Sequence, residues 1–165
     1  MKILAYLFVI TFSFYSCQSQ SKNQAKSESK ESTYNVEKTE SEWREALTPQ
    51  QYYVLREAGT ERPFTSEYNK NPEKGTYSCA ACENPLYESA HKFDSGTGWP
   101  SFDRAIKGSV LTGVDYKLGY ARNELKCGNC GGHLGHVFGD GPRENTGQRH
   151  CINGVALNFS KKNNG

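Results

Sequence analysis

The sequence predicts a mainly β, antiparallel domain with one or two short helices. Sixteen glycines and ten tyrosines accompany a hydrophobic content of 35%, which is typical of short strands and many turns around a modest core. From Gly75 onward, short segments are divided by Gly, Pro, Asn and Asp turns. A helical signal precedes this region, near Pro49. Together these observations favour a β fold with little helix.

The helical signal lies between Thr48 and Gly59. Thr48 is a suitable N-cap, Pro49 takes the first helical position, and Gln51 completes a capping box. Gly59 is the natural end of this helix. We therefore expect one short helix at the start of the folded region.

The strands are expected in the glycine-rich region. The predicted segments are 76–79, 86–93, 109–116, 124–127, 133–138 and 150–159. Strand alternation predicts one face of the last segment that carries Arg149, Cys151, Asn153, Val155, Leu157 and Phe159. The thiol of Cys151 would then lie where a core face meets an opening.

The chain divides into three parts. Residues 1–17 resemble a bacterial lipoprotein signal, with Lys2 as the charged region and Cys17 as the residue that is lipidated after cleavage. Residues 18–42 are polar and predict a disordered tether with a reach of roughly 25 to 30 Å, and residues 43–165 form the folded domain. An uncleaved anchor or an ordinary secretory signal is the alternative. We expect a periplasm-facing lipoprotein of the cell envelope, with Gln18 after the cysteine favouring the outer membrane.

Charge argues against a nucleic-acid partner. The formal net charge is only +2 and the lysines are scattered, so no large field of one sign attracts a phosphate backbone. Membrane contact is expected only through a lipid anchor, and short apolar segments favour a monomer.

Four cysteines form two Cys-x-x-Cys pairs, Cys79 with Cys82 and Cys127 with Cys130. Two such pairs can close a tetrahedral zinc site, so we expect one structural Zn²⁺ per chain. Export favours disulfides as an alternative, but the Gly and Asn residues beside the pairs favour metal ligation. Cys151 is left as the candidate reactive thiol.

Charged side chains near Cys151 point to nucleophilic or redox chemistry. Arg149 would favour the thiolate, which is the nucleophile. His133 or His136 could protonate a leaving oxygen, with Asp140 fixing a ring orientation. The alternative is that one histidine is purely structural or ligates the metal.

Longer motifs resemble the B-type peptide methionine sulfoxide reductases. Besides the cysteine pairs, they are Gly98-Trp99-Pro100-Ser101-Phe102, Gly132-His133-Leu134-Gly135-His136-Val137-Phe138-Gly139-Asp140-Gly141-Pro142 and Arg149-His150-Cys151-Ile152-Asn153-Gly154. The similarity runs over residues 47–159. The resemblance implies two antiparallel sheets in a tent-like fold, a four-cysteine zinc, and repair of oxidised proteins by reduction of the R epimer of methionine sulfoxide.

The resemblance also implies roles for individual residues. Cys151 would attack the sulfoxide sulfur and be left as a sulfenic acid, with His136 as the acid. Supporting roles would fall to His133, Asp140, Arg149 and Asn153. Trp99 and Phe102 would contact the substrate, Trp99 through a sulfur–aromatic contact, although plain core packing is as good an account of Trp99.

Thr97 departs from the family pattern, because many members have a resolving cysteine there. The sulfenic acid would therefore need an external reductant, which we expect to be a thioredoxin-fold protein. Two other functions remain open: a zinc-ribbon binding module or holdase without chemistry, and a thiol enzyme with another redox task such as peroxide reduction. Sulfoxide turnover and its stereochemistry would separate them.

Overall fold

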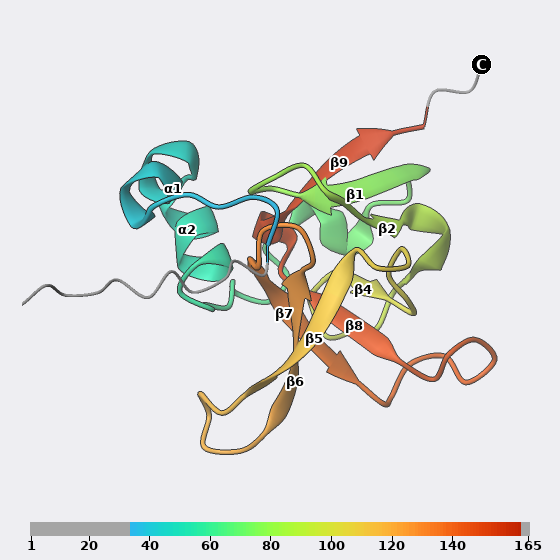
Figure 1. Ribbon diagram of the computed structural model, residues 1–165. Helices are drawn as coiled ribbons and strands as arrows, with labels where there is room; N and C mark the ends of the chain where they lie inside the picture. The colour runs from blue at the N-terminus through green and yellow to red at the C-terminus, as the bar shows by residue number, and fades with distance from the viewer. Residues whose placement is uncertain (1–33, 163–165) are drawn as a thin grey trace, which may run out of the picture. The chain divides into compact units, whose positions relative to one another are not determined.

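A computed structural model describes residues 34–162 of the chain (Figure 1). The predicted signal at 1–17 and the predicted tether up to residue 33 lie outside the described residues. In the described part, two α-helices and one short 3-10 helix precede a β region, and two further short 3-10 helices interrupt it. No helix among residues 34–162 has the length and apolar character needed to cross a membrane.

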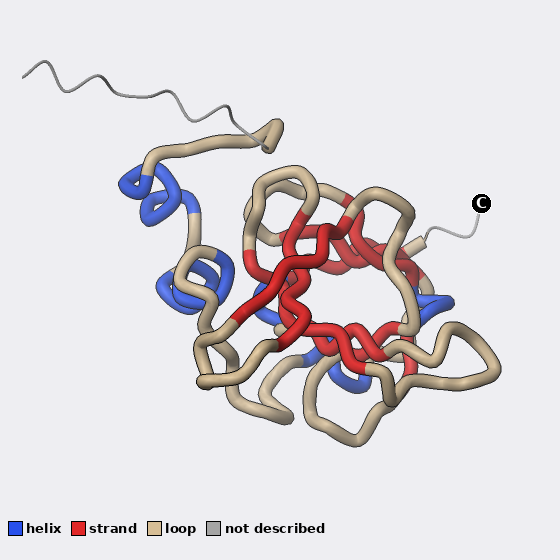
Figure 2. Tube along the Cα trace, turned by 60° about the horizontal axis from the view of Figure 1, so that its bottom comes forward, coloured by secondary structure: helices blue, strands red, loops and turns tan. Residues whose placement is uncertain are grey.

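The strands form two antiparallel sheets, as predicted. The smaller sheet has the order β2-β1-β9, with β2 at Pro85–Glu88, β1 at Gly75–Cys79 and β9 at Leu157–Lys161. The larger has the order β3-β4-β8-β7-β6-β5. Its strands are β3 Lys92–Phe93, β4 Ser101–Phe102, β5 Val110–Asp115, β6 Arg122–Cys127, β7 His133–Phe138 and β8 Arg149–Ile152. In Figure 2 the strands surround the core and the two α-helices lie to one side of them.

Both α-helices start with a capping box. Helix α2, at Pro49–Leu55, has Thr48 as its N-cap and Gln51 as the reciprocal partner, as predicted, although it ends at Leu55 rather than near Gly59. Helix α1, at Glu40–Ala46, was not predicted. Its signal is the same, since Thr39 caps Glu42 in a second capping box.

The predicted boundary at residue 43 is wrong by several residues. Helix α1 begins at Glu40, inside the segment predicted as tether, because its capping box and the buried Trp43 stabilise it. Upstream of the helix, the Val36 amide donates to the carbonyl of Asn129 at 3.0 Å, and Val36 packs against the core. The ordered domain therefore includes residues before 43.

The predicted strand at 150–159 is two strands in different sheets. Strand β8 ends at Ile152, the 3-10 helix η3 covers Gly154–Ala156, and β9 then pairs with β1. The turn is held by Glu61, whose carboxylate accepts from the amides of Gly154 at 2.6 Å and Val155 at 2.9 Å. The single face predicted from Arg149 to Phe159 is therefore wrong beyond Ile152.

The segment predicted as one strand at 86–93 is also divided. Strand β2 ends at Glu88, the 3-10 helix η2 covers Ser89–His91, and β3 follows in the other sheet. A further 3-10 helix, η1, covers Glu67–Lys70. The core lies between the sheets and is rich in aromatic side chains: Tyr77 packs edge-on against Phe102 at 5.1 Å, and Tyr87 stacks on Phe102 at 4.3 Å.

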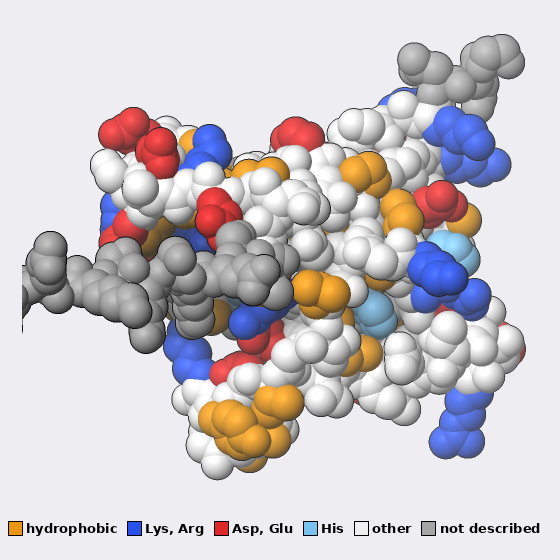
Figure 3. All heavy atoms as spheres, in the orientation of Figure 1, with side chains coloured by type: hydrophobic (Ala, Val, Ile, Leu, Met, Phe, Trp, Pro, Cys, Tyr) orange, Lys and Arg blue, Asp and Glu red, His pale blue; other side chains and the backbone are white. Residues whose placement is uncertain are grey.

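Exposed apolar side chains gather on the hairpin that joins β5 to β6. They are Val114, Tyr116, Leu118 and Tyr120, each at least 56% exposed. Figure 3 shows hydrophobic side chains on this projecting hairpin, below the body of the domain. The Lys117 ammonium ties the hairpin to the end of α2, because it donates to the carbonyls of Glu57 and Ala58.

Candidate active site

Strand register places the candidate reactive groups in one row across the larger sheet. Glu124 of β6 pairs with His136 of β7, His136 with Cys151 of β8, and Cys151 with Ser101 of β4. Directly paired residues point to the same face of a sheet. The thiol and the predicted acid are therefore cross-strand neighbours, although 15 positions separate 136 from 151 in the sequence.

A bulge brings His133 to the same face as His136. Residues three apart in a regular strand point to opposite faces. The register between β6 and β7 shifts at Leu125/Lys126, so that His133 pairs with Lys126 while His136 pairs with Glu124. The two imidazole rings lie 5.2 Å apart, edge to face. Strand alternation alone would have separated them.

A pocket of about 130 Å³ opens beside Cys151. Its walls are Thr60, Trp99, Arg122, Gly135, His136, Phe138, Cys151 and Asn153. This volume suits the end of a side chain rather than a large ligand. Of the predicted site residues, the pocket thus includes Cys151, His136, Asn153 and Trp99. Gly135 is required at its base, because a Cβ there would lie 2.0 Å from the carbonyl oxygen of Cys151.

Opposing influences act on the Cys151 thiol. Burial raises the pKa of Cys151, and this effect outweighs the Arg149 guanidinium and the Thr97 hydroxyl, which both favour the thiolate. Arg149 lies where its charge favours the thiolate, but burial prevails, so the net effect on the free protein is a raised pKa of Cys151. Thr97 belongs to a chain of hydroxyl groups, since its Oγ1 lies 2.8 Å from Ser95 Oγ, and Ser95 Oγ lies 2.7 Å from Ser101 Oγ.

Asp140 is paired with Arg149 rather than with a histidine. Two guanidinium nitrogens of Arg149 donate to the two carboxylate oxygens of Asp140, each at 2.9 Å. The guanidinium also lies 4.5 Å from the ring centroid of Phe138, its cross-strand partner. The prediction of Asp140 as the group that orients a histidine ring is therefore wrong, because Asp140 binds Arg149 and the rings of His133 and His136 bind other carboxylates.

Each histidine has a different carboxylate partner, which the sequence did not reveal. Nε2 of His136 lies 2.9 Å from Oδ2 of Asp115, at the end of β5. Nδ1 of His133 lies 2.7 Å from Oε1 of Glu124. Burial lowers the pKa of His133 despite Glu124, and His133 is absent from the pocket walls. His136 is thus the histidine that can reach a bound molecule.

Asn153 and Trp99 are both held by the main chain of Glu61. The amide of Glu61 donates to Oδ1 of Asn153 at 3.0 Å, and its carbonyl accepts from Nε1 of Trp99 at 3.2 Å. Asn153 also donates from Nδ2 to the carbonyl of Leu134 at 3.0 Å. Two walls of the pocket therefore depend on the loop after α2, which holds no recognisable sequence motif.

Phe102 does not reach the pocket. Its side chain is fully buried and stacks on Tyr87. Since Ser101 faces the site as the partner of Cys151, strand alternation directs Phe102 to the opposite, core face. The prediction of Phe102 as a substrate contact is wrong for this reason.

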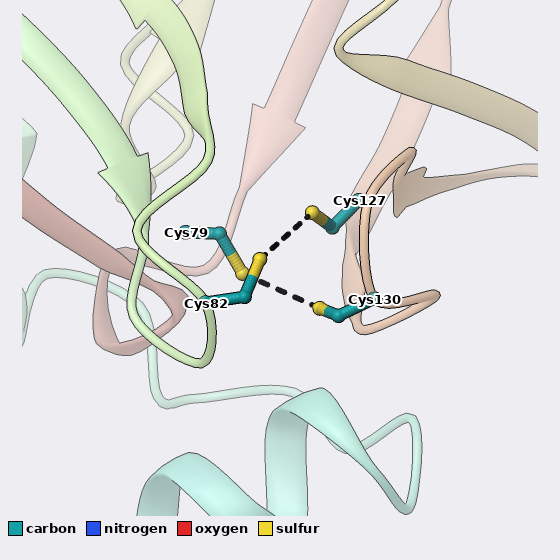
Figure 4. A group of neighbouring side chains, drawn as sticks. All are labelled: Cys79, Cys82, Cys127 and Cys130. Carbon is teal, nitrogen blue, oxygen red and sulfur yellow. Dashed lines mark hydrogen bonds between the residues drawn. The ribbon is translucent and has the colours of Figure 1, made fainter. Parts of the chain in front are cut away.

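Four cysteine side chains converge at the ends of the two sheets (Figure 4). Cys79 is the last residue of β1 and Cys82 follows in the next turn, while Cys127 is the last residue of β6 and Cys130 follows in the next turn. Their sulfur atoms all lie within 4.8 Å of one another, with 3.8 Å between Cys79 and Cys130 and 3.6 Å between Cys82 and Cys127. A tetrahedron with metal–sulfur bonds of about 2.3 Å has edges of roughly 3.8 Å. The cluster therefore fits a tetrahedral metal ion such as zinc.

The two cysteine loops have matching backbone geometry. In the first, the amides of Cys82 and Glu83 donate to the carbonyl of Cys79, and in the second, the Gly131 amide donates to Cys127. Glu83 and Gly131, which follow the second cysteine of each pair, both have a positive φ, 58° and 69°. Side-chain amides of Asn84 and Asn129 lie 3.6 Å from the sulfurs of Cys127 and Cys82. Among the described residues all five cysteines are free thiols, so the disulfide alternative finds no support there.

Fold and site together define a small two-sheet protein with a four-cysteine cluster that could hold a metal ion and, among residues 34–162, one further cysteine in a pocket. The SelR domain model matches residues 47–161. The chain is 55% identical over 125 residues to the peptide methionine sulfoxide reductase MsrB of Agrobacterium fabrum, covering 75% of this chain and 92% of that protein. It is 49% identical over 136 residues to the protein of that name from Burkholderia cenocepacia, covering 82% and 95%. The chain belongs to the SelR family, the B-type peptide methionine sulfoxide reductases.

Proposed function

We propose that this protein reduces the R epimer of methionine sulfoxide in peptides and proteins to methionine. The observation that carries the proposal is the cross-strand pair of Cys151 and His136 in one pocket, in a chain of this family. A pocket of about 130 Å³ fits the end of a methionine sulfoxide side chain. Trp99 would offer its indole to the terminal methyl group.

The reaction starts with attack of the Cys151 sulfur on the sulfoxide sulfur. His136 donates a proton to the sulfoxide oxygen, and the S–O oxygen is transferred to the cysteine. Methionine leaves with its sulfur reduced, and Cys151 is oxidised to the sulfenic acid. Burial raises the pKa of Cys151 in the free protein, so the thiol must release its proton when its sulfur attacks, and this proton offsets the one that His136 donates. Arg149 and Thr97 stabilise the thiolate at that stage.

The deciding experiment offers the purified chain peptides that contain either the R or the S sulfoxide, with dithiothreitol as reductant. We expect turnover of the R epimer alone and its loss in Cys151→Ser. Hydrogen peroxide in a parallel reaction tests the alternative thiol chemistry. A folded, metal-loaded sample that reduces neither epimer would contradict the proposal.

An external thioredoxin-fold protein is proposed as the reductant. Thr97, Ser95 and Ser101 surround Cys151 where a second thiol would be needed. Two external thiols would return the sulfenic acid to the thiol and release a disulfide and water. Thr97→Cys should form an internal disulfide with Cys151 after one turnover, detected as a mass loss in the oxidised protein. If Thr97→Cys still formed a mixed disulfide between Cys151 and the external thioredoxin-fold protein at the wild-type rate, the role assigned to Thr97 would be contradicted.

Zinc is proposed as the metal of the four-cysteine cluster, one ion per chain and with a structural role. Thiolate ligands in a closed tetrahedral set support zinc rather than a hard cation. Elemental analysis of the purified chain should give about one zinc per chain, and a content far below this would refute the assignment.

A lipid anchor at Cys17 is proposed for residues 1–17, together with location in the cell envelope and a monomeric state. The short apolar segment and Cys17 in the sequence support it. Mass spectrometry of the mature protein should show a chain that begins with a modified Cys17. A mature protein that keeps residues 1–16, or that starts at an unmodified residue, would overturn the anchor.

A further inference from the structure

The carboxylate beside His136 has no role in the reaction described above. Oδ2 of Asp115 lies 2.9 Å from Nε2 of His136. Asp115 ends β5, two strands away from the histidine, and its side chain is only 13% exposed. The loop residue Asp140, which the sequence suggested for this position, is instead bound to Arg149 and is 64% exposed.

Asp115 is fixed by the hairpin that carries it. Its Oδ1 accepts from the amide of Lys117 at 2.7 Å. Its Oδ2 accepts from Arg122, the residue directly opposite on β6, and Arg122 is also a wall of the pocket. The Lys117 amide, together with His136 and Arg122, holds the pKa of Asp115 well below its usual range. The group is therefore an ionised carboxylate that can only accept hydrogen bonds.

An acceptor at this place fixes the tautomer of the ring. Nε2 of His136 must carry the hydrogen that it donates to Asp115, so in the neutral ring Nδ1 holds the lone pair. Within residues 34–162, no hydrogen bond from another group occupies Nδ1 of His136. When the ring is protonated, Nδ1–H is consequently the donor that remains for a bound molecule.

We propose that Asp115, held by Arg122, is the positioning residue for His136: it binds Nε2–H and leaves Nδ1 to serve the sulfoxide oxygen. This inference rests on the proposed function. The proton passes from Nδ1 of His136 to that oxygen, and Asp115 keeps its charge throughout. Asp115 thus stabilises the orientation of the acid without touching the reacting atoms.

The test combines kinetics and nitrogen NMR on the full chain with its metal bound. In Asp115→Asn, kcat for the R sulfoxide peptide should fall about 100-fold while KM changes less than about twofold. The rate of Cys151 alkylation should not change, because the thiol does not contact Asp115. Asp115→Glu should recover part of kcat, since a carboxylate is restored. The matched control Glu73→Gln removes an ion-paired surface carboxylate and should leave kcat unchanged.

The histidine nitrogens give a second, substrate-free readout. Wild-type His136 should show the hydrogen on Nε2, and Asp115→Asn should show a mixture of both tautomers. A wild-type ring with its hydrogen on Nδ1, or a kcat in Asp115→Asn within threefold of wild type, would overturn the inference. Failure of the proposed function would look different from failure of this inference, because the wild-type protein would then be inactive on both epimers. If Asp115→Asn does not fold, the nitrogen NMR spectrum of the wild-type protein still tests the inference, because it shows which nitrogen of His136 carries the hydrogen.

Discussion

At the scale of single residues, the reactive site is set by competing effects on one thiol. Burial favours the neutral form of Cys151, while Arg149 and Thr97 favour the thiolate, and burial prevails. A buried, protonated thiol is protected from chance oxidation, because the thiolate is the species that reacts. Substrate binding can then provide the activation that the free protein lacks.

The balance at Cys151 predicts a measurable pH dependence. In Arg149→Met, loss of the guanidinium removes a group that favours the thiolate, so the pKa of Cys151 should rise further above its usual range. The pH profile of iodoacetamide alkylation should therefore move to higher pH, with a slower rate at neutral pH. Mass spectrometry of Cys151 at a series of pH values measures this profile.

Asp140→Asn is the matched variant. The Asp140 carboxylate opposes the thiolate, so its removal with Arg149 retained should move the alkylation profile to lower pH. A profile that moves upward in both variants would mean that Asp140 acts only by holding Arg149 in place.

At the scale of elements, the site depends on features that interrupt regular strands. The bulge in β6–β7 turns His133 and His136 to one face, and η3 begins just after β8, the strand that carries Cys151. Glu61 joins these elements: its carboxylate binds the amides of η3, and its main chain binds Asn153 and Trp99. The loop after α2 therefore positions the pocket without contributing the reactive group.

Glu61→Ala should destabilise the fold and weaken the site together. The buried amide of Gly154 and the partly buried amide of Val155 would lose their acceptor, which costs about 2 to 4 kcal/mol of the free energy of unfolding. Urea denaturation measures this loss, and activity should fall because Asn153 and Trp99 lose their common support. The exposed Glu67→Ala, in the following 3-10 helix, should change stability by less than about 0.5 kcal/mol. Equal stability of the two variants would contradict the role of Glu61.

At the scale of the whole molecule, the cysteine cluster connects the two sheets. Cys79 ends β1 in the smaller sheet and Cys127 ends β6 in the larger, so a metal ion there would join elements that share no strand pairing. A modest core of this kind benefits from such a link, because a small domain buries limited apolar surface.

Removal of the metal should therefore destabilise the entire domain rather than one loop. Each 1 kcal/mol lost lowers Tm by about 4 °C in a domain of this size, and we expect a decrease of about 10 °C or more after chelation, measured by calorimetry. Cys82→Ser should reproduce the decrease, and Cys151→Ser with metal bound should not. A Tm unchanged in the metal-free protein would exclude a stabilising role.

The sequence alone determined the features that depend on local pattern. The capping box at Thr48, the pairing of the four cysteines by spacing and the isolation of Cys151 are all readable from neighbouring residues. Their physical basis is short-range: a cap requires residues three apart, and a metal loop requires two cysteines at one turn. Even the missed helix α1 carried the same signal, at Thr39 and Glu42.

Tertiary structure decided which distant groups meet. The partner of His136 is Asp115 rather than Asp140, Phe102 faces the core rather than the pocket, and residues 150–159 divide between two sheets. Each outcome follows from strand register, bulges and the buried carboxylate of Glu61, which involve contacts between residues far apart in the chain. Alternation within one strand cannot reveal them, because a single irregular residue reverses which face a side chain occupies.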